Sequence, residues 1–286
     1  MLVVECGEPV HRALNRAVVL ARHFKGRLEL VLVESDWSMF PLSTRGERPD
    51  DSPSAKSYLD SLCASVGDLD LIVTCEVVGA RSQRQSLVQL ISERRPDLVV
   101  RPAHGELAGE GGFLRSDLRF AQTCPAPLLL TSGRSWHAKP RLAALVYPLD
   151  PQAAAATRVV ANFAARLREL FQGELEILTA RSAVGDGVVS LASRCWLSDL
   201  ARQSGGSANG PRPVDGQSSL ARVLAEQEID VLIHSAPESN DSLISEPASP
   251  SPSLLATLDG ALMAMECDLL FVRAGRANIV NQLGPS

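Results

Sequence analysis

Apolar positions in the first part of the chain alternate between short continuous runs and helical spacing. Continuous runs, which predict strands, cover residues 2–4, 28–33, 71–78, 98–100 and 128–130. Between them, apolar side chains three and four positions apart predict helices over residues 9–24, 57–65, 83–94 and 117–123. Gly26 is expected to supply the left-handed residue that ends the first helix. This alternation predicts an α/β fold of parallel strands and right-handed crossovers, with helices on both faces of the sheet.

The second part of the chain shows the same alternation. Strands are predicted over residues 142–146, 175–178, 231–234 and 269–272, with a short edge strand near 213–214. Helices are predicted over residues 152–171, 188–203, 218–226 and 254–265. Residues 235–253 are rich in serine, proline and acidic side chains, which is typical of a long polar loop.

Short sequences recur between the two parts in the same order. Gly26-Arg-Leu-Glu-Leu-Val-Leu is similar to Gly173-Glu-Leu-Glu-Ile-Leu-Thr, and Asp97-Leu-Val-Val is similar to Asp230-Val-Leu-Ile. Such self-similarity indicates two copies of one structural unit. We therefore expect one domain over residues 1–133, a linker over 134–140, a second domain over 141–275 and a tail over 276–286.

Composition narrows the class of protein. The chain has 286 residues, 45% of them hydrophobic, with a formal net charge of −5 and 4% aromatic residues. An acidic chain poor in aromatic side chains is not expected to bind nucleic acid. No run approaches the roughly 20 apolar residues of a membrane span, and no secretory signal precedes the first strand, so we expect a cytoplasmic protein without a membrane partner. Six scattered cysteines without a C-x-x-C motif predict neither a disulfide framework nor a metal site.

Three segments resemble the universal stress protein family in its tandem form. They are the opening residues 1–14, the phrase Pro96-Asp-Leu-Val-Val-Arg-Pro-Ala-His-Gly105, and the closing Cys124-Pro-Ala-Pro-Leu-Leu-Leu-Thr131. Residues 117–127 are similar to the E-type tandem members, in which an Asp, a Cys and two prolines recur at this spacing. The resemblance is strong over residues 1–132 and loose over 140–275.

The resemblance implies a specific architecture. Each domain would hold a five-stranded parallel sheet of the Rossmann-like, adenine nucleotide alpha hydrolase-like type, and the second copy is degenerate. The two domains would pair through their last strands, residues 128–131 and 269–273, so that one chain imitates a dimer. Pairing would cover apolar edge strands that could otherwise aggregate. Further association into a homodimer is left open.

The family's nucleotide-binding members carry glycines after the fourth strand, which let backbone N–H groups approach phosphate. Here Gly105 is present, Gly109 comes one residue late, and Ser116 stands near the position of a Gly-Ser pair. Glu106 and Glu110 in the same loop would repel phosphate. The equivalent loop of the second part has no glycine. We therefore expect nucleotide binding to be lost or weakened in both parts.

Other candidate residues lie at the carboxyl ends of predicted strands, where α/β folds bind ligands. Cys6 stands where the family places an acidic residue, although a shifted alignment would give that place to Glu5. Cys6 is either a reactive thiol at a helix start or a small buried hydrophobe. His104 either contacts a ligand or faces water. Trp37 and Phe40 could line an apolar pocket. Asp117 is expected to be either the N-cap or a first-turn acid of its helix.

The chain carries no recognisable motif of hydrolases, metalloproteases or nucleoside triphosphatases. We therefore expect a non-enzymatic stress-response protein without a cofactor or metal, which binds a small or apolar molecule or a protein partner. The alternative is an ATP- or AMP-binding protein with weak Mg²⁺-dependent ATPase activity, using Cys6, His104, Gly105, Gly109 and Ser116.

Overall fold

The computed structural model describes residues 2–4, 8–33, 55–66, 71–78, 83–103, 113–132, 134–146, 153–180, 198–199, 202, 212–214, 216–235 and 265–273. By its contacts the chain divides into two compact units. Unit 1 comprises Met1–Pro102 and Cys124–Ala126, and unit 2 comprises Ala103–Thr123 and Pro127–Ser286. The domain boundaries expected from the sequence stay a prediction.

Unit 1 contains four parallel strands in the order β3-β2-β1-β4. Their bounds are β1 (Leu2–Val4), β2 (Arg27–Val33), β3 (Ile72–Val78) and β4 (Val99–Pro102). Strand β1 is central because Leu2 pairs with Leu30 of β2 on one side and with Val100 of β4 on the other. The expected parallel arrangement is confirmed.

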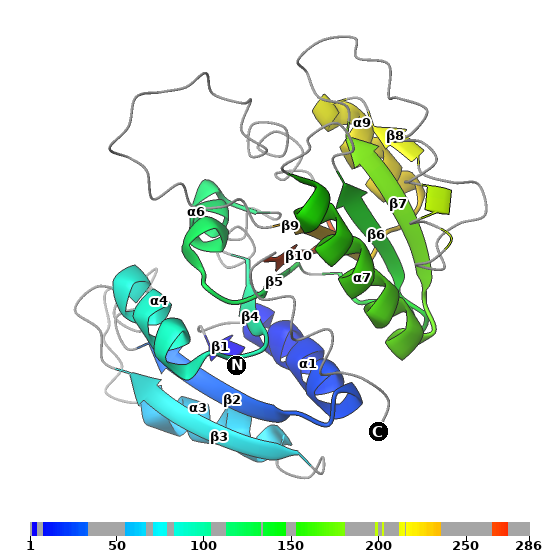
Figure 1. The fold of residues 1–286 in the computed structure, drawn as a ribbon. Coiled ribbons are helices and arrows are strands. Elements are labelled where there is room, and N and C mark those ends of the chain that lie inside the picture. The colour runs from blue at the N-terminus through cyan, green and yellow to red at the C-terminus, as the bar shows by residue number, and fades with distance from the viewer. Residues whose placement is uncertain are drawn as a thin grey trace, which may run out of the picture. The chain divides into compact units, whose positions relative to one another are not determined.

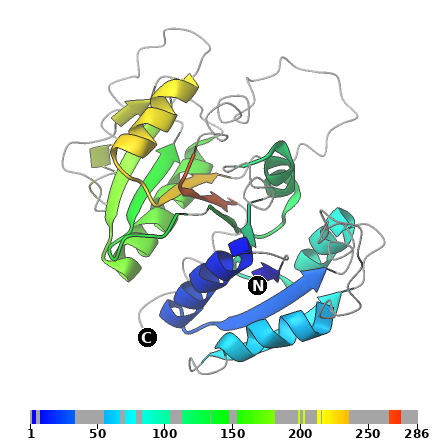
Figure 2. The same ribbon diagram turned by 180° about the vertical axis from the view of Figure 1, so that it is seen from behind.

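Helices cover both faces of the unit 1 sheet. Figure 2 shows α1 (Glu8–His23) and α3 (Ala55–Val66) in front of the strands, and α4 (Gln83–Arg94) lies on the opposite face, toward the viewer in Figure 1. The helices bury the apolar positions that predicted them, among them Ala13, Leu59 and Ile91. Apolar side chains are therefore buried between the sheet and the helices on each of its two faces.

Unit 2 contains six strands in the order β8-β7-β6-β9-β10-β5. Their bounds are β5 (Leu128–Thr131), β6 (Arg141–Val146), β7 (Glu174–Ala180), β8 (Arg212–Val214), β9 (Val231–Ser235) and β10 (Asp268–Val272). Strands β8, β7, β6, β9 and β10 are parallel, while β5 runs antiparallel to β10, with Leu130 opposite Leu269 and Leu128 opposite Phe271. These four side chains are buried, so the antiparallel pair lies inside the core of the unit.

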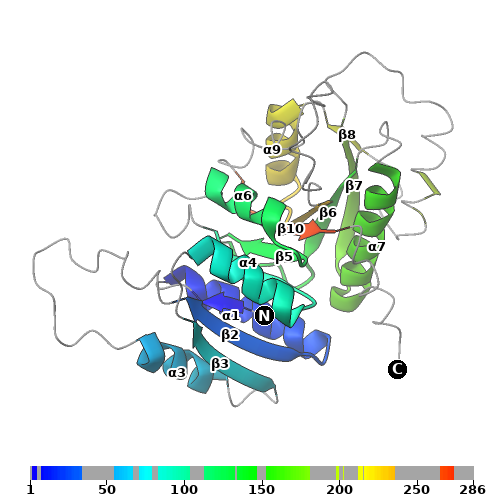
Figure 3. The ribbon, with the colours of Figure 1, turned by 60° about the vertical axis from the view of Figure 1, so that its left-hand side comes forward.

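The order β8-β7-β6-β9 in unit 2 repeats the order β3-β2-β1-β4 in unit 1. In Figure 3, α7 (Ala153–Phe171) and α9 (Gly216–Glu226) lie on opposite faces of the unit 2 strands. A third helix, α6 (Arg115–Thr123), ends where the Arg273 guanidinium donates to the Ala121 and Gln122 carbonyls, at 3.1 and 2.6 Å. The predicted edge strand near 213–214 is present as β8. The helix predicted over 254–265 lies almost wholly outside the described residues.

Helix ends use left-handed residues other than glycine. Lys25, Arg95, Gln172 and Glu228 have φ values between 47° and 50°. The expectation for Gly26 is therefore wrong: Lys25 takes the left-handed position, and the Gly26 N–H donates back to the Ala21 carbonyl at 2.8 Å. The same kind of hydrogen bond closes α7 and α9. One residue beyond the left-handed position, the Gly173 N–H donates to the Arg168 carbonyl and the Ile229 N–H donates to the Leu224 carbonyl. This is the Schellman arrangement, with the left-handed residue one position earlier than expected.

The cysteines differ in state. Cys63 of α3 and Cys75 of β3 form a disulfide, with their Cα atoms 6.7 Å apart. The scattered spacing of the cysteines did not predict this bridge. Cys124 and Cys267 are buried thiols outside any disulfide, whereas Cys6 and Cys195 lie outside the described residues.

Candidate functional site

Only one of the five residues predicted for a nucleotide site lies within the described residues. Ser116 is exposed in the first turn of α6. Cys6, His104, Gly105 and Gly109 lie outside the described part of the chain, as do Trp37 and Phe40 of the expected apolar pocket. The predicted nucleotide site therefore stays a prediction.

Asp117, next to Ser116, has a structural role at the start of α6. Its side chain is fully buried, and Oδ2 accepts a hydrogen bond from the Leu114 N–H at 2.9 Å. The Asp117 N–H in turn donates to the Leu114 carbonyl at 3.0 Å. This reciprocal contact satisfies N–H groups that a helix start leaves unpaired. The expectation of a first-turn acid is confirmed.

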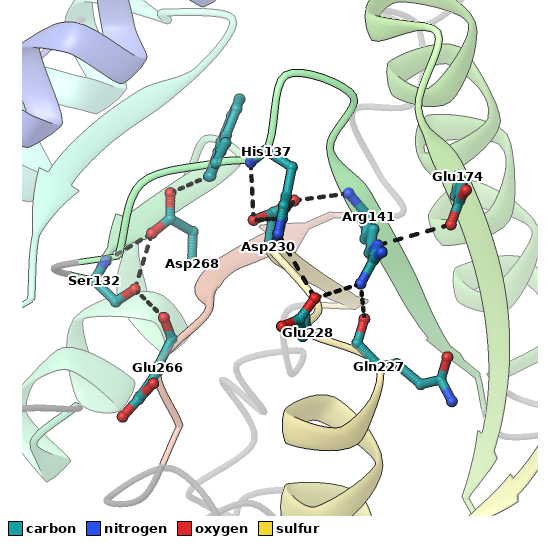
Figure 4. Close-up of polar contacts among 10 residues, drawn as sticks. Ser132, His137, Arg141, Glu174, Gln227, Glu228, Asp230, Glu266 and Asp268 are labelled. Atoms are coloured by element: carbon teal, nitrogen blue, oxygen red, sulfur yellow. Dashed lines mark hydrogen bonds and ion pairs between the residues drawn. The ribbon is translucent and has the colours of Figure 1, made fainter.

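A second polar site occurs in unit 2, where two buried carboxylates lie at the amino ends of neighbouring strands (Figure 4). Asp230 directly precedes β9, and Asp268 is the first residue of β10. Each is 1% exposed, and the Asp268 N–H donates to the Asp230 carbonyl at 2.8 Å. We call these two residues the carboxylate pair. Because a buried carboxylate must be hydrogen-bonded, its partners define the role of the site.

Asp268 binds the start of the segment that leads from β5 to β6. Oδ1 accepts hydrogen bonds from the Ser132 N–H at 2.8 Å and from its hydroxyl at 3.2 Å. Oδ2 accepts one from the Trp136 indole N–H at 2.7 Å. The Trp136 ring also packs edge-on against Phe171 at the end of α7, with 5.5 Å between centroids. Asp268 thus fixes both Ser132 and the first aromatic residue of the linker.

Asp230 binds the rest of the linker. Its carboxylate accepts hydrogen bonds from the His137 N–H at 3.2 Å and from the Arg141 N–H at 2.8 Å. The His137 ring Nδ1 lies 2.9 and 3.0 Å from the two carboxylate oxygens and must donate, since a carboxylate only accepts. Asp230 therefore holds the linker at its middle and at its junction with β6.

A charged outer layer surrounds this contact. The Arg141 guanidinium lies 2.7 Å from Glu228 Oε2 and 3.9 Å from Glu174 Oε2. His137 Nε2 lies 3.8 Å from the same Glu228 oxygen. These groups are partly exposed, so their individual contributions to stability are small.

The contacts described for this site hold a segment of the chain in place. An Asp–His pair can orient a general base, but such a base needs a nucleophile or substrate at the other ring nitrogen. Within the described residues, the hydrogen-bond and ion-pair partners of His137 are Asp230 and Glu228. Likewise, no group of three or more potential metal ligands occurs among the described side chains.

His234, near the carboxyl end of β9, lies at the opposite end of the strand from Asp230. Its ring is fully buried, packs edge-on against Phe271 at 6.2 Å and contacts the Ser235 carbonyl. Burial lowers the pKa of His234 to about 4, although the bond to Ser235 acts in the opposite direction. The imidazole is therefore neutral at pH 7 and offers no positive charge to an anionic ligand.

Cys267, directly before Asp268, is a buried thiol. Burial, together with the negative charge of the adjacent Asp268, raises the pKa of the Cys267 thiol to about 12. A thiol reacts through its thiolate, so Cys267 is inert at neutral pH.

Sequence reasoning missed the carboxylate pair and its partners Trp136 and His137. The sequence did contain one difference that could have drawn attention to Asp268: the equivalent position in the first part of the chain is Pro127. Asp97 occupies the place of Asp230 in the repeat but is exposed in unit 1. The repeat therefore identifies the acidic position, while only the fold shows that the linker covers one copy of it.

The described part of the chain contains no helix of the length and hydropathy that a bilayer span requires. Neither a protein-family model nor a curated protein matches the chain. Several solved structures, in contrast, are similar to this chain. A protein of unknown function from Pseudomonas aeruginosa PAO1 is 16% identical with a TM-score of 0.70, covering 99% of this chain and 94% of that one.

Two further solved structures carry a family description. A candidate universal stress protein from Pseudomonas aeruginosa UCBPP-PA14 is 16% identical, with a TM-score of 0.71 and coverage of 99% of this chain and 95% of that one. A universal stress protein from Archaeoglobus fulgidus is 11% identical, with a TM-score of 0.60 and coverage of 95% of both chains. At these identities the likeness concerns the fold, and the chain has an α/β fold like that of universal stress proteins.

Proposed function

We propose that this chain is a non-enzymatic stress-response protein of the universal stress type, in tandem form, which binds a small molecule or a protein partner. The observation that carries the proposal is the likeness to universal stress proteins over 95–99% of the chain. The strand order shared by the two units supports the tandem form, since two copies of one ancestral unit would produce it.

The tandem form includes intramolecular pairing of the two domains through their last strands. The antiparallel contact between β5 and β10 supports this pairing, because β5 is the last strand of the predicted domain 1–133 and β10 the last strand of the predicted domain 141–275. Their apolar side chains are buried, as such a seam requires. A chain paired in this way needs no second copy to cover those edges.

We further propose that neither domain retains an effective ATP site and that the protein needs no cofactor. In the first domain, Glu106 and Glu110 place negative charge in the loop that would surround the phosphates. In the second, residues 236–253 contain no glycine, and the buried neutral His234 supplies no charge. A triphosphate binds where backbone N–H groups and cations converge, and both loops are poor in these features.

The competing function is a weak ATPase that uses the loop of the first domain. The exposed position of Ser116 at the start of α6 favours it, because a hydroxyl at a helix start can contact phosphate. The two functions differ in whether adenine nucleotide stabilises the native chain.

Thermal unfolding of the full chain with and without millimolar ATP and Mg²⁺ tests the proposal. A ligand present at a hundred times its Kd adds about 2.7 kcal/mol, which would raise Tm by about 5–10 °C. We expect no shift with ATP, ADP or AMP. A rise in Tm that Ser116→Glu abolishes, and that Ser61→Glu on α3 leaves intact, would establish the competing function instead.

A further inference from the structure

We propose that Cys63 and Cys75 form a reversible thiol–disulfide pair that fastens helix α3 to edge strand β3 of unit 1 and responds to low-molecular-weight disulfides of the glutathione type. The two sulfurs are bonded, and their Cα separation of 6.7 Å lies within the range that a disulfide spans. This modification concerns unit 1 and does not depend on the proposed function.

The surrounding side chains explain why these two cysteines meet. Cys63 lies on the inward face of α3, together with the buried Leu59, Leu62 and Val66. Along β3, Ile72, Thr74 and Glu76 are exposed, whereas Cys75 belongs to the alternate, less exposed set that α3 covers. The helical periodicity of α3 and the alternation of side chains along β3 therefore place both thiols between the helix and the strand.

Their position also makes the pair accessible to a small reagent. Cys63 and Cys75 are only partly buried, and β3 pairs with β2 alone among the described strands of its unit. In contrast, Cys124 and Cys267 are fully buried, and the pKa of Cys267 is raised to about 12. Exposure and thiolate formation govern thiol exchange, so the reaction should select the first pair.

The chemistry is two successive exchanges. The thiolate of one cysteine attacks a sulfur of glutathione disulfide, forming a mixed disulfide and releasing one glutathione thiolate, which takes up a proton. The thiolate of the other cysteine then attacks the protein sulfur of the mixed disulfide and releases the second glutathione. The two protein thiols lose two electrons and two protons, and one glutathione disulfide is reduced to two molecules of glutathione.

Closure of the pair changes how α3 is held. In the reduced state, α3 is attached through the buried contacts of Leu59, Leu62 and Val66. In the oxidised state, the covalent bond closes a loop with a sequence separation of 12 residues, which restricts the unfolded chain. Oxidation is therefore expected to raise the Tm of the full chain by about 5–10 °C.

The test equilibrates the full chain with glutathione and glutathione disulfide at graded ratios, quenches with acid, alkylates the free thiols and analyses the peptides by mass spectrometry. We expect the Cys63–Cys75 cross-link to form and disappear with the ratio, while Cys124 and Cys267 are modified only after denaturation. The Tm should rise with oxidation in the wild type and stay constant in the Cys63→Ser/Cys75→Ser double variant. Each single variant should carry one glutathione on its remaining cysteine.

Three results would overturn the proposal. Thiols that remain free at every ratio would show that the pair does not close. A cross-link that survives a large excess of reduced glutathione in the folded chain would show a permanent bridge. A cross-link from either cysteine to a different partner would show that the pairing is wrong.

Discussion

Gly173 and Gly26 form a matched pair that tests the path of the linker. Each follows a left-handed residue at the end of a helix and precedes a central-sheet strand, so their backbones are closely similar. A Cβ at Gly26 would meet its nearest neighbour, the Ala21 carbonyl oxygen, at an ordinary 3.8 Å. A Cβ at Gly173 would lie 2.2 Å from the Pro140 carbonyl oxygen, because the linker passes directly over it.

The size of the effect follows from how firmly Pro140 is held. Its carbonyl accepts a hydrogen bond from the Glu174 N–H at 3.0 Å, and the next residue, Arg141, donates to the buried Asp230. Gly173→Ala must displace this backbone, which strains the packing and weakens a buried hydrogen bond. Together these effects should lower the free energy of unfolding by about 2–4 kcal/mol. Gly26→Ala should be neutral or raise it by about 0.4–1 kcal/mol, since alanine restricts the unfolded chain.

Urea unfolding followed by circular dichroism measures both variants beside the wild type. The midpoint of the Gly173→Ala variant should fall clearly while the slope of the transition stays unchanged, and that of Gly26→Ala should not fall. Equal midpoints for the two variants would refute the described approach of Pro140 to Gly173.

Three further predictions concern single side chains. Asp230→Asn should lower the free energy of unfolding by about 1–3 kcal/mol in urea titrations, because the amide cannot accept from both the His137 and Arg141 N–H groups. Asp97→Asn is the control: Asp97 has the equivalent position in the first part of the chain but is exposed, so this variant should change the free energy of unfolding little. Burial lowers the pKa of His234 to about 4 from 6.5, so between pH 6.5 and pH 4 the unfolded chain binds a proton that the folded chain excludes. The free energy of unfolding should therefore decrease as the pH falls through this range, by up to about 3 kcal/mol near pH 4. His234→Gln should flatten this part of the stability–pH curve, and an unchanged slope would assign it to other groups. Lys25→Gly and Gln172→Gly should each raise the free energy of unfolding by about 0.5–1 kcal/mol, because glycine adopts a positive φ without strain; a decrease at either position would contradict the left-handed geometry.

The sequence predicted the strands and helices where one residue pattern decides the local structure. Leu30, Val31 and Leu32 of β2 and residues 142–146 of β6 are buried on both faces of their sheets, as continuous apolar runs in parallel sheets should be. The edge strand β8 was also predicted, although it is only three residues long. Local patterns are sufficient for such strands because the residues that are apolar in the sequence are the ones that the fold buries.

The remaining features depend on contacts between distant residues. Asp230 binds groups 89 and 93 positions earlier in the chain, and Asp268 binds Trp136 across 132 positions. Cys63 and Cys75 meet only because α3 folds back onto β3. The left-handed residue at the end of the first helix was placed one position late, at Gly26 instead of Lys25, because the prediction rested on the conformational preference of glycine.

Acid extraction of the full chain after purification, followed by mass spectrometry of the released small molecules, tests the central claim most directly. The account predicts that no ATP, ADP or AMP accompanies the protein, and that any molecule found near one equivalent per chain is not an adenine nucleotide. Adenine nucleotide released at close to one equivalent per chain would contradict it.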